Sequence, residues 1–383
     1  MPAKILIGAD LVPTKSNLEL FQEGNILELI GEDLEALLSK CDFTIFNLEV
    51  PLVDTATPIK KAGPNLIAPI NTIVGLKAIN PNFFTLANNH ILDQGDKGLF
   101  STIDILKREG IAYAGVGENL DAASRAYIQK IDDIDIGIYC CAEHEFSIAT
   151  ENKPGANPFN PLESLDQISR LSEQCDRVIV LYHGGKEHYR YPSPNLRKVC
   201  RKIVEKGADL VVCQHSHCIG CKEEWKDGTI VYGQGNFLFD DCDNDFWNTG
   251  LLLELNKNFE IEYVPIVKKG NKVRMAIEEK NQILEDFYKR SEEIKDQNFV
   301  EQEYMKCAKS ECLRYLKRMQ GNRFQSLLFR IINKLSGHRF IKIMLSNQYS
   351  GNNKYGLINL LDCEVHRECL LYYLKNGYGE DDE

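Results

Sequence analysis

Short apolar runs alternate with amphipathic helical segments through the first 268 residues, and this alternation limits the fold more than any other feature. Buried-strand patterns occur at 4–7, 43–46, 83–86, 136–140, 178–182 and 208–212. Helical spacing occupies 98–109 and 196–206, and a glycine follows each stretch. The segments 250–255 and 259–266 alternate in polarity, which predicts closing antiparallel strands. Together these patterns predict an α/β domain with helices on both faces of its sheets.

The sequence after residue 268 has a different character. Residues 280–319 are charged, favour helix and contain neither proline nor glycine, while 324–335 and 357–374 have amphipathic helical spacing. We therefore predict an α/β domain over 1–268 and an all-helical extension over 269–383. The extension is expected to pack on the α/β domain, to bind a partner or to form a dimer.

Charge and cysteine usage restrict the class of protein. The net charge is −11, without a clustered basic stripe, which argues against nucleic acid as the main partner. We see no signal peptide, and no apolar run approaches the ~20 residues that span a bilayer, so no transmembrane segment is expected. Thirteen cysteines without an export signal indicate a reducing compartment, and we expect the protein to be cytoplasmic.

Residues that can bind a metal or move a proton follow five of the predicted strands. They stand at the carboxyl ends, where ligands bind in open α/β sheets. Each end offers a carboxylate, an amide or an imidazole: Asp10; Glu49; Asn88, Asn89 and His90; His183; and His215 with His217. Accident explains one or two such positions, whereas five favour a shared site.

The pair His215 and His217 is the strongest single indication, because it follows the apolar run 208–212. In an extended strand, residues i and i+2 point to the same side. Neutral imidazole is the commonest metal ligand. We therefore expect both imidazoles to reach one point just past the strand end. The alternative is a surface loop with two incidental histidines.

The mixture of carboxylate, amide and imidazole suits divalent Mn, Fe, Zn or Mg. Two such ions about 3.5–4 Å apart can clamp a phosphoryl group, and Glu49 is the natural bridge between them. His90, with Asp93 placed to orient its ring, is expected to protonate a leaving oxygen. We expect one or two ions, with ligands from Asp10, Glu49, Asn89, His183, His215 and His217.

Each candidate also has a structural interpretation. Asp10 fits a turn or a helix N-cap, and Glu49 fits a solvated loop acid. Asn88 and Asn89 fit a tight turn, because asparagine tolerates left-handed backbone. His183 fits a satisfied core histidine. The remaining histidines have no comparable setting and are expected to be structural or exposed: residues 144, 188, 338 and 366.

The ordered motifs resemble bacterial capsule synthesis proteins of the CapA type, which are associated with poly-γ-glutamate and polysaccharide capsules. The resemblance spans roughly residues 4–268 and rests on the stretches 47–52, 86–95, 110–117, 183–185, 207–217 and 233–240. That family is similar to calcineurin-like metallophosphoesterases. The resemblance therefore implies a four-layer αββα sandwich with a dinuclear metal site, to which the C-terminal helical extension is added.

Carried over residue by residue, the resemblance makes Asp10 the metal ligand of the first motif and Glu49 the counterpart of a bridging aspartate. It makes Asn89 a ligand and His90 the catalytic histidine. It also makes His183, His215 and His217 the later histidine ligands, and places Glu187 in an extended motif that lines the pocket. We further expect Asn88, Glu187 and Asn236 to bind substrate. The chain departs from the first motif at Val12, where the phosphoesterases have a histidine, so one ligand of the first metal is missing.

Two functions agree with these residues. The first is a metal-dependent hydrolase of capsule, exopolysaccharide or poly-γ-glutamate biosynthesis, in which activated water attacks a phosphoester or a related bond. The second is a non-catalytic accessory subunit that binds metal or an anionic polymer and joins a capsule synthesis complex through the helical extension. Val12 favours the second function, and His90 beside Asn89 favours the first.

Overall fold

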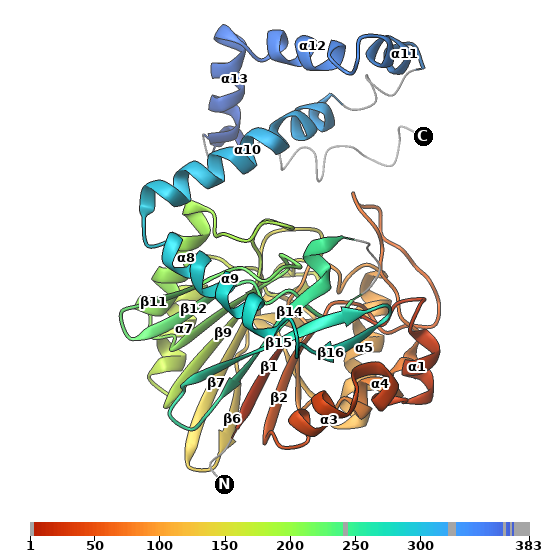
Figure 1. The fold of residues 1–383 in the computed structure, drawn as a ribbon, viewed down its shortest axis with the longest axis vertical. Coiled ribbons are helices and arrows are strands. Elements are labelled where there is room, and N and C mark those ends of the chain that lie inside the picture. Colours follow the sequence, from red (N-terminus) through yellow and green to blue (C-terminus); the bar gives the residue numbers. More distant parts are fainter. Residues whose placement is uncertain (1–3, 240–243, 321–326, 363–364, 368–369, 371–383) are drawn as a thin grey trace. The chain divides into compact units, whose positions relative to one another are not determined.

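The computed structural model describes residues 4–239, 244–320, 327–362, 365–367 and 370 (Figure 1). Its first sheet has a parallel centre and an antiparallel flank. The order is β16 (Lys272–Met275), β15 (Ile261–Lys269), β14 (Thr249–Leu255), β1 (Ile5–Leu11), β2 (Phe43–Leu48), β3 (Phe83–Thr85) and β4 (Ala112–Ala114). A further strand, β13 (Asn236–Leu238), runs parallel to β1. The predicted antiparallel strands at 250–255 and 259–266 are confirmed as β14 and β15.

The second sheet is parallel at its centre and closed by an antiparallel strand at each edge. The order is β11 (Lys222–Trp225), β12 (Gly228–Tyr232), β10 (Leu210–Gln214), β9 (Arg177–His183), β7 (Ile134–Ala142) and β6 (Tyr127–Ile131). A separate antiparallel pair is formed by β5 (Val116–Gly117) and β8 (Gly155–Ala156).

The two sheets pack face to face, because alternate strand residues point to opposite sides. In β1, Ile5 and Ile7 belong to the apolar cluster between the sheets, while Leu6 belongs to the cluster beneath the outer helices. In β9, Ile179 faces the other sheet and Val180 faces outward. Three apolar clusters thus separate four layers, and the predicted αββα sandwich is confirmed.

Helices cover the outer face of each sheet (Figure 1). The first sheet is covered by α1 (Leu18–Glu23), α2 (Ile26–Ile30), α3 (Glu32–Leu38), α4 (Ile73–Ala78) and α5 (Gly95–Glu109), with the short 3₁₀ turn η1 (Ile70–Thr72) before α4. The second is covered by α7 (Ser164–Ser172) and α8 (Pro194–Glu205). Two further short elements are α6 (Leu120–Ala123) and the 3₁₀ turn η2 (Asp245–Asn248).

The ends of the longer helices follow their sequence signals. Helix α5 stops at Gly110, whose φ of 69° lets its amide bond to the last carbonyls of the helix. Helix α8 begins after Ser193, whose side chain accepts from the amide of Leu196, and Pro194 takes the first helical position. These caps fix where β4 and β9 connect to the helices beside them.

The chain divides into two compact units, residues 1–304 and 305–383. The division differs from the predicted one at residue 268 because β16 and α9 (Lys280–Glu293) are integral to the first unit. Helix α9 packs on β11 and β15, and its Phe287 is fully buried in the cluster between the sheets. Its buried surface is narrow, which explains why its sequence reads as a charged, exposed helix.

The second unit is helical, as predicted for this end of the chain. Ile341 and Leu345 form its small buried cluster. Its helices are the end of α10 (Gln297–Met319), α11 (Leu327–Leu335), α12 (Phe340–Gln348) and α13 (Gly351–Asp362). Residues 324–326 and 371–374 of the predicted helical stretches lie outside the described residues. Within the described ranges, every helix is too short or too polar to cross a bilayer.

Candidate metal centre

The two sheets bring the carboxyl ends of their central strands to a common rim. Asp10 lies near the end of β1, and Glu49 directly follows β2. His183 is the last residue of β9, and His215 directly follows β10. Both carboxylates are fully buried, and the exposed fraction of each imidazole-bearing residue is below a tenth. Side chains up to 205 residues apart in sequence therefore meet in one protected place, where the amide of His215 donates to Asp10 Oδ2.

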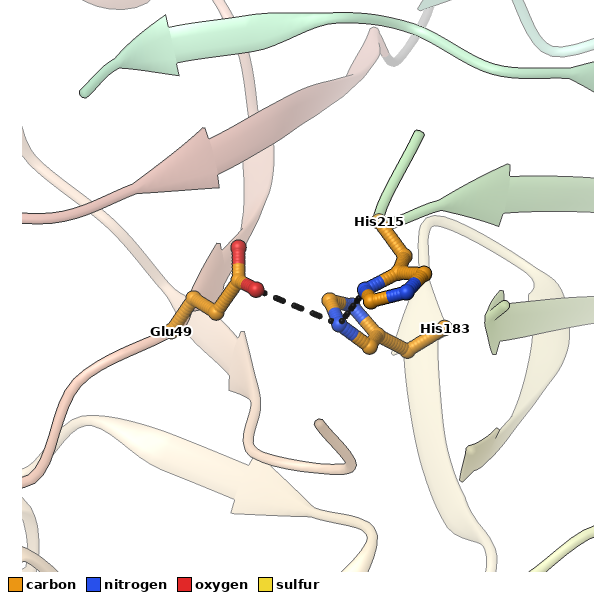
Figure 2. A group of neighbouring side chains, drawn as sticks. All are labelled: Glu49, His183 and His215. Carbon is orange, nitrogen blue, oxygen red and sulfur yellow. Dashed lines mark hydrogen bonds and ion pairs between the residues drawn. The ribbon is translucent and has the colours of Figure 1, made fainter. Parts of the chain in front are cut away.

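Glu49, His183 and His215 form the first group of ligating atoms (Figure 2). His183 Nε2 lies 3.3 Å from Glu49 Oε1 and 3.1 Å from His215 Nδ1. The same nitrogen lies 3.0 Å from Asn89 Oδ1. The amide of Asn89 is held in this orientation because its Nδ2 donates to Glu145 Oε2 at 2.9 Å.

Glu49 also belongs to a second group, with Asp10 and His217. His217 Nδ1 lies 3.4 Å from Asp10 Oδ2 and 2.9 Å from Asn236 Oδ1. In each group the ligating atoms lie within 4.8 Å of one another. The carboxylate of Glu49 is the part that both groups share.

The carboxylate of Glu49 is the strongest reason to place a cation here. Both of its oxygens are buried, and neither has a hydrogen-bond partner among the described residues. Burial, followed by the charge of Asp10, raises the pKa of Glu49 to about 8. A buried anion is costly unless it is paired or coordinates a metal. Carboxylate, amide and imidazole donors fit a divalent ion of the Mn, Fe, Zn or Mg group.

The histidines differ in protonation. Burial lowers the pKa of His183 to about 4. The pKa of His215 is also lowered, by burial and by the neighbouring imidazoles. Burial acts in the same direction on His217, but its hydrogen bond to Asp10 and the charges of Glu49 and Asp10 raise its pKa to about 9. His183 and His215 are thus neutral at pH 7, which is the form that binds metal.

The two histidines after β10 do not lie on an extended strand, so our reason for pairing them was wrong. Strand β10 ends at Gln214, and both residues have left-handed backbone, with φ of 87° at His215 and 52° at His217. Non-glycine residues in this region cost about 1–3 kcal/mol each and persist only where the surroundings hold them. The turn places the two imidazoles in different groups rather than at one point.

A second cluster, next to Asn89, surrounds His90. His90 Nδ1 lies 2.6 Å from Asp93 Oδ2, as predicted for an orienting carboxylate. The ammonium of Lys61 pairs with the other oxygen of Asp93 and lies 3.3 Å from His90 Nδ1. The amide of Leu66 also donates to Asp93, at 2.6 Å. Asp93 is therefore fixed from three sides, and it engages the Nδ1 side of the His90 ring.

Residues 12–241 match the model of the protein family described as "Bacterial capsule synthesis protein PGA_cap". The chain belongs to this family. It is 32% identical over 212 residues to the capsule biosynthesis protein CapA of Bacillus anthracis, which covers 53% of this chain and 52% of that protein. It is 28% identical over 216 residues to the PGA biosynthesis protein CapA of Bacillus subtilis, which covers 55% and 57%. The chain thus spans about half the length of these capsule proteins.

Among solved structures, the fold is similar to that of a phosphatase from Mycoplasma pneumoniae, with a TM-score of 0.46 and 13% identity. The similarity covers 70% of this chain and 95% of that chain. The capsule family match begins two residues after Asp10 and includes the other predicted ligands, from Glu49 to His217. Val12 is buried in the apolar cluster under the outer helices.

The three residues assigned to substrate binding occupy different settings. Asn88 is fully buried, its Nδ2 donates to Asn47 Oδ1 and Leu48 O, and its Oδ1 accepts from the amide of His90. Turn formation therefore explains Asn88 better than substrate binding. Glu187 lies exposed at the rim, where the charges of His215 and His217 outweigh burial and lower its pKa. Asn236 is buried against His217.

Several residues that contribute to the site were missed in the sequence analysis. Asn47 Nδ2 donates to Asp10 Oδ1 at 2.7 Å and contacts His183 Nδ1 at 3.1 Å, so it joins the two sheets. Asn47 lies on β2, two residues before Glu49, which directly follows this strand. This spacing was a usable signal, because residues two apart in an extended segment point to the same side of the sheet. Lys61 and Glu145 come from loops and carry no local signal. Trp247, whose ring lies 4.7 Å from that of His217, was also missed.

Proposed function

We propose that this chain is a metal-dependent hydrolase of capsule or poly-γ-glutamate biosynthesis, acting on a phosphoester or a related bond. The observation that carries the proposal is the buried carboxylate of Glu49, which has no hydrogen-bond partner among the described residues and is shared by two groups of metal-ligating atoms. The adjacent pair of His90 and Asp93 supports catalysis, because a site that only holds metal has no need of an oriented acid. The names of the Bacillus relatives support the place in capsule synthesis.

We assign metal binding and proton transfer to different residues of the site. Asp10, Glu49, Asn89, His183, His215 and His217 would hold the metal. Divalent ions in such a site lower the pKa of water and polarise phosphoryl oxygens. His90 would give its Nε2 proton to the leaving oxygen as the bond to that oxygen breaks, and water supplies the new bond to phosphorus. Asp93, neutralised in part by Lys61, holds the His90 ring and stabilises its proton on Nδ1.

Hydrolysis of bis(4-nitrophenyl) phosphate, measured at 405 nm with added Mn²⁺, tests the proposal. We expect His90→Ala to lower kcat by about 10²–10⁴-fold, the usual contribution of a general acid, with metal content unchanged. His338→Ala is the matched control, because this exposed histidine lies in the other unit. Equal rates for the wild-type protein and His90→Ala would reject His90 as the acid.

Val12 keeps a second function open. Its apolar side chain removes one ligand of the first motif, and a site that has lost a ligand fits a non-catalytic accessory subunit that binds an anionic polymer. Docking of such a subunit to a synthesis complex is supported by the exposed apolar residues of α11: Leu327, Leu328, Ile331 and Leu335. Absence of turnover on every ester tested, together with binding of poly-γ-glutamate in a sedimentation assay, would favour this function.

The proposed compartment is the cytoplasm. Thirteen cysteines favour a reducing environment, where thiols persist. Alkylation with a membrane-impermeant maleimide on intact cells tests this placement. An unlabelled protein that becomes labelled only after lysis is the expected result, and labelling of the folded protein on intact cells contradicts it.

A further inference from the structure

The group of Asp10, Glu49 and His217 lacks the ligand that position 12 supplies in phosphoesterases. Val12 is 2% exposed and packs in the apolar cluster beneath the helices of the first sheet. Its side chain has no atom that can bind a cation. A second metal at this position therefore completes its coordination with water or with a donor from another part of the chain.

Asn236 lies where such a donor is needed. It begins β13, which pairs in parallel with β1, and its Cα partner in the register is Asp10. The residue is 5% exposed, and its Oδ1 lies 2.9 Å from His217 Nδ1. Its Nδ2 is buried and has no partner in the part of the chain that the structure describes. The contact of Oδ1 with His217 Nδ1 therefore orients the amide of Asn236, and it directs the oxygen toward the nitrogen that belongs to the group of ligating atoms.

The distances around His217 match those of the other group. Ligands about 2.1 Å from one ion and 90–109° apart are about 3.0–3.4 Å from each other. Around His183 Nε2 the separations are 3.0, 3.1 and 3.3 Å, to Asn89, His215 and Glu49. Around His217 Nδ1 they are 2.9 Å to Asn236 and 3.4 Å to Asp10. The separations in both sets are within about 0.1 Å of these edge lengths.

We propose that the amide oxygen of Asn236 replaces the missing ligand, so that the site binds two divalent ions, each with one asparagine oxygen. Asp10, Glu49, His217 and Asn236 form one ligand set, and Glu49, Asn89, His183 and His215 form the other. The inference rests on the metal centre proposed above but not on hydrolysis. Asn236 thereby becomes a metal ligand rather than the substrate-binding residue predicted from the sequence.

Cobalt binding to the full-length protein tests the proposal. Apoprotein is titrated with Co²⁺ by calorimetry, and its visible absorption bands, which report the ligands around cobalt, are recorded at each addition. We expect two equivalents for the wild-type protein and for Asn236→Asp, which keeps an oxygen donor. We expect one equivalent for Asn236→Leu, which has a similar shape and no donor, and one for Asn89→Leu, with different residual spectra.

Each outcome decides the matter. An Asn236→Leu protein that binds two equivalents with wild-type spectra, even if 10–100-fold more weakly, would show that Asn236 only orients His217. A single equivalent in the wild-type protein also overturns the proposal. No binding by the wild-type protein overturns the metal centre itself, which separates this failure from failure of catalysis. Circular dichroism and the thermal midpoint establish that each variant is folded, and Asn236→Asp provides the informative comparison if Asn236→Leu is not.

Discussion

Replacing Glu49 by glutamine should weaken the pH dependence of stability in the metal-free protein. Glu49 is fully buried without a hydrogen-bond partner among described groups, and its pKa is raised from 4.5 to about 8. Because the pKa is higher in the folded state, the folded protein keeps this proton between pH 4.5 and 8 while the unfolded chain releases it. The free energy of unfolding therefore falls as the pH rises through this window.

The expected size follows from the shift. Integrating the proton uptake between pH 5 and pH 9 gives a loss of about 4 kcal/mol from Glu49. His217, whose pKa is raised to about 9, adds a loss in the same direction, and this loss is smaller in the Glu49→Gln protein because the charge of Glu49 is one cause of the raised pKa. Glutamine stays neutral, so the Glu49→Gln protein should lose about 4 kcal/mol less over the same range. An imperfectly paired amide costs about 1–3 kcal/mol, but this cost is the same at every pH.

Urea unfolding with excess chelator, followed by tryptophan fluorescence at pH 5, 6, 7, 8 and 9, measures the effect. Both tryptophans, Trp225 and Trp247, lie in the unit of residues 1–304 and report its unfolding. Glu187→Gln is the matched control, because the pKa of this rim carboxyl is lowered rather than raised. If the curves of unfolding free energy against pH run parallel within about 1 kcal/mol for the wild-type protein and Glu49→Gln, Glu49 is not a buried acid with a raised pKa.

Three further outcomes are expected. Asn47→Ala should weaken Zn²⁺ binding by about 10–100-fold in calorimetry, because Asn47 holds Asp10 and His183, whereas Asn258→Ala in the β14–β15 turn should not change it. Lys61→Met should lower the free energy of unfolding by about 3 kcal/mol, because it leaves Asp93 buried with one cation fewer; the exposed neighbour variant Lys60→Met should change it by less than about 0.5 kcal/mol. Co²⁺ should quench the fluorescence of Trp247 beside His217, and quenching that survives in Trp247→Phe would contradict this arrangement.

The sheets were predictable because their central strands are buried on both faces and read as continuous apolar runs. Strands β9 and β10 show this, since all five residues of β10 are buried. Helix α9 was harder to place. Its main anchor in the core is Phe287, and a single buried aromatic in a charged helix does not reveal that the helix closes the sandwich.

The candidate site was predictable where it depended on strand ends and not where it depended on turns or loops. Asp10, Glu49 and His183 follow from the sheet rule alone. The separation of His215 from His217 depends on two left-handed residues, and the pattern of side chains does not encode the sign of φ. Lys61 reaches Asp93 from 32 residues away through a loop, and only the folded chain shows this contact.

A single carboxylate between two ligand sets makes them one thermodynamic unit. If a cation in one ligand set changes the affinity of the other set by some factor, a cation in the other set must change the affinity of this set by the same factor. This equality does not depend on the order in which the ions are added. Glu49 is that shared group, so its substitution should change the coupling between the two binding steps as well as their strength.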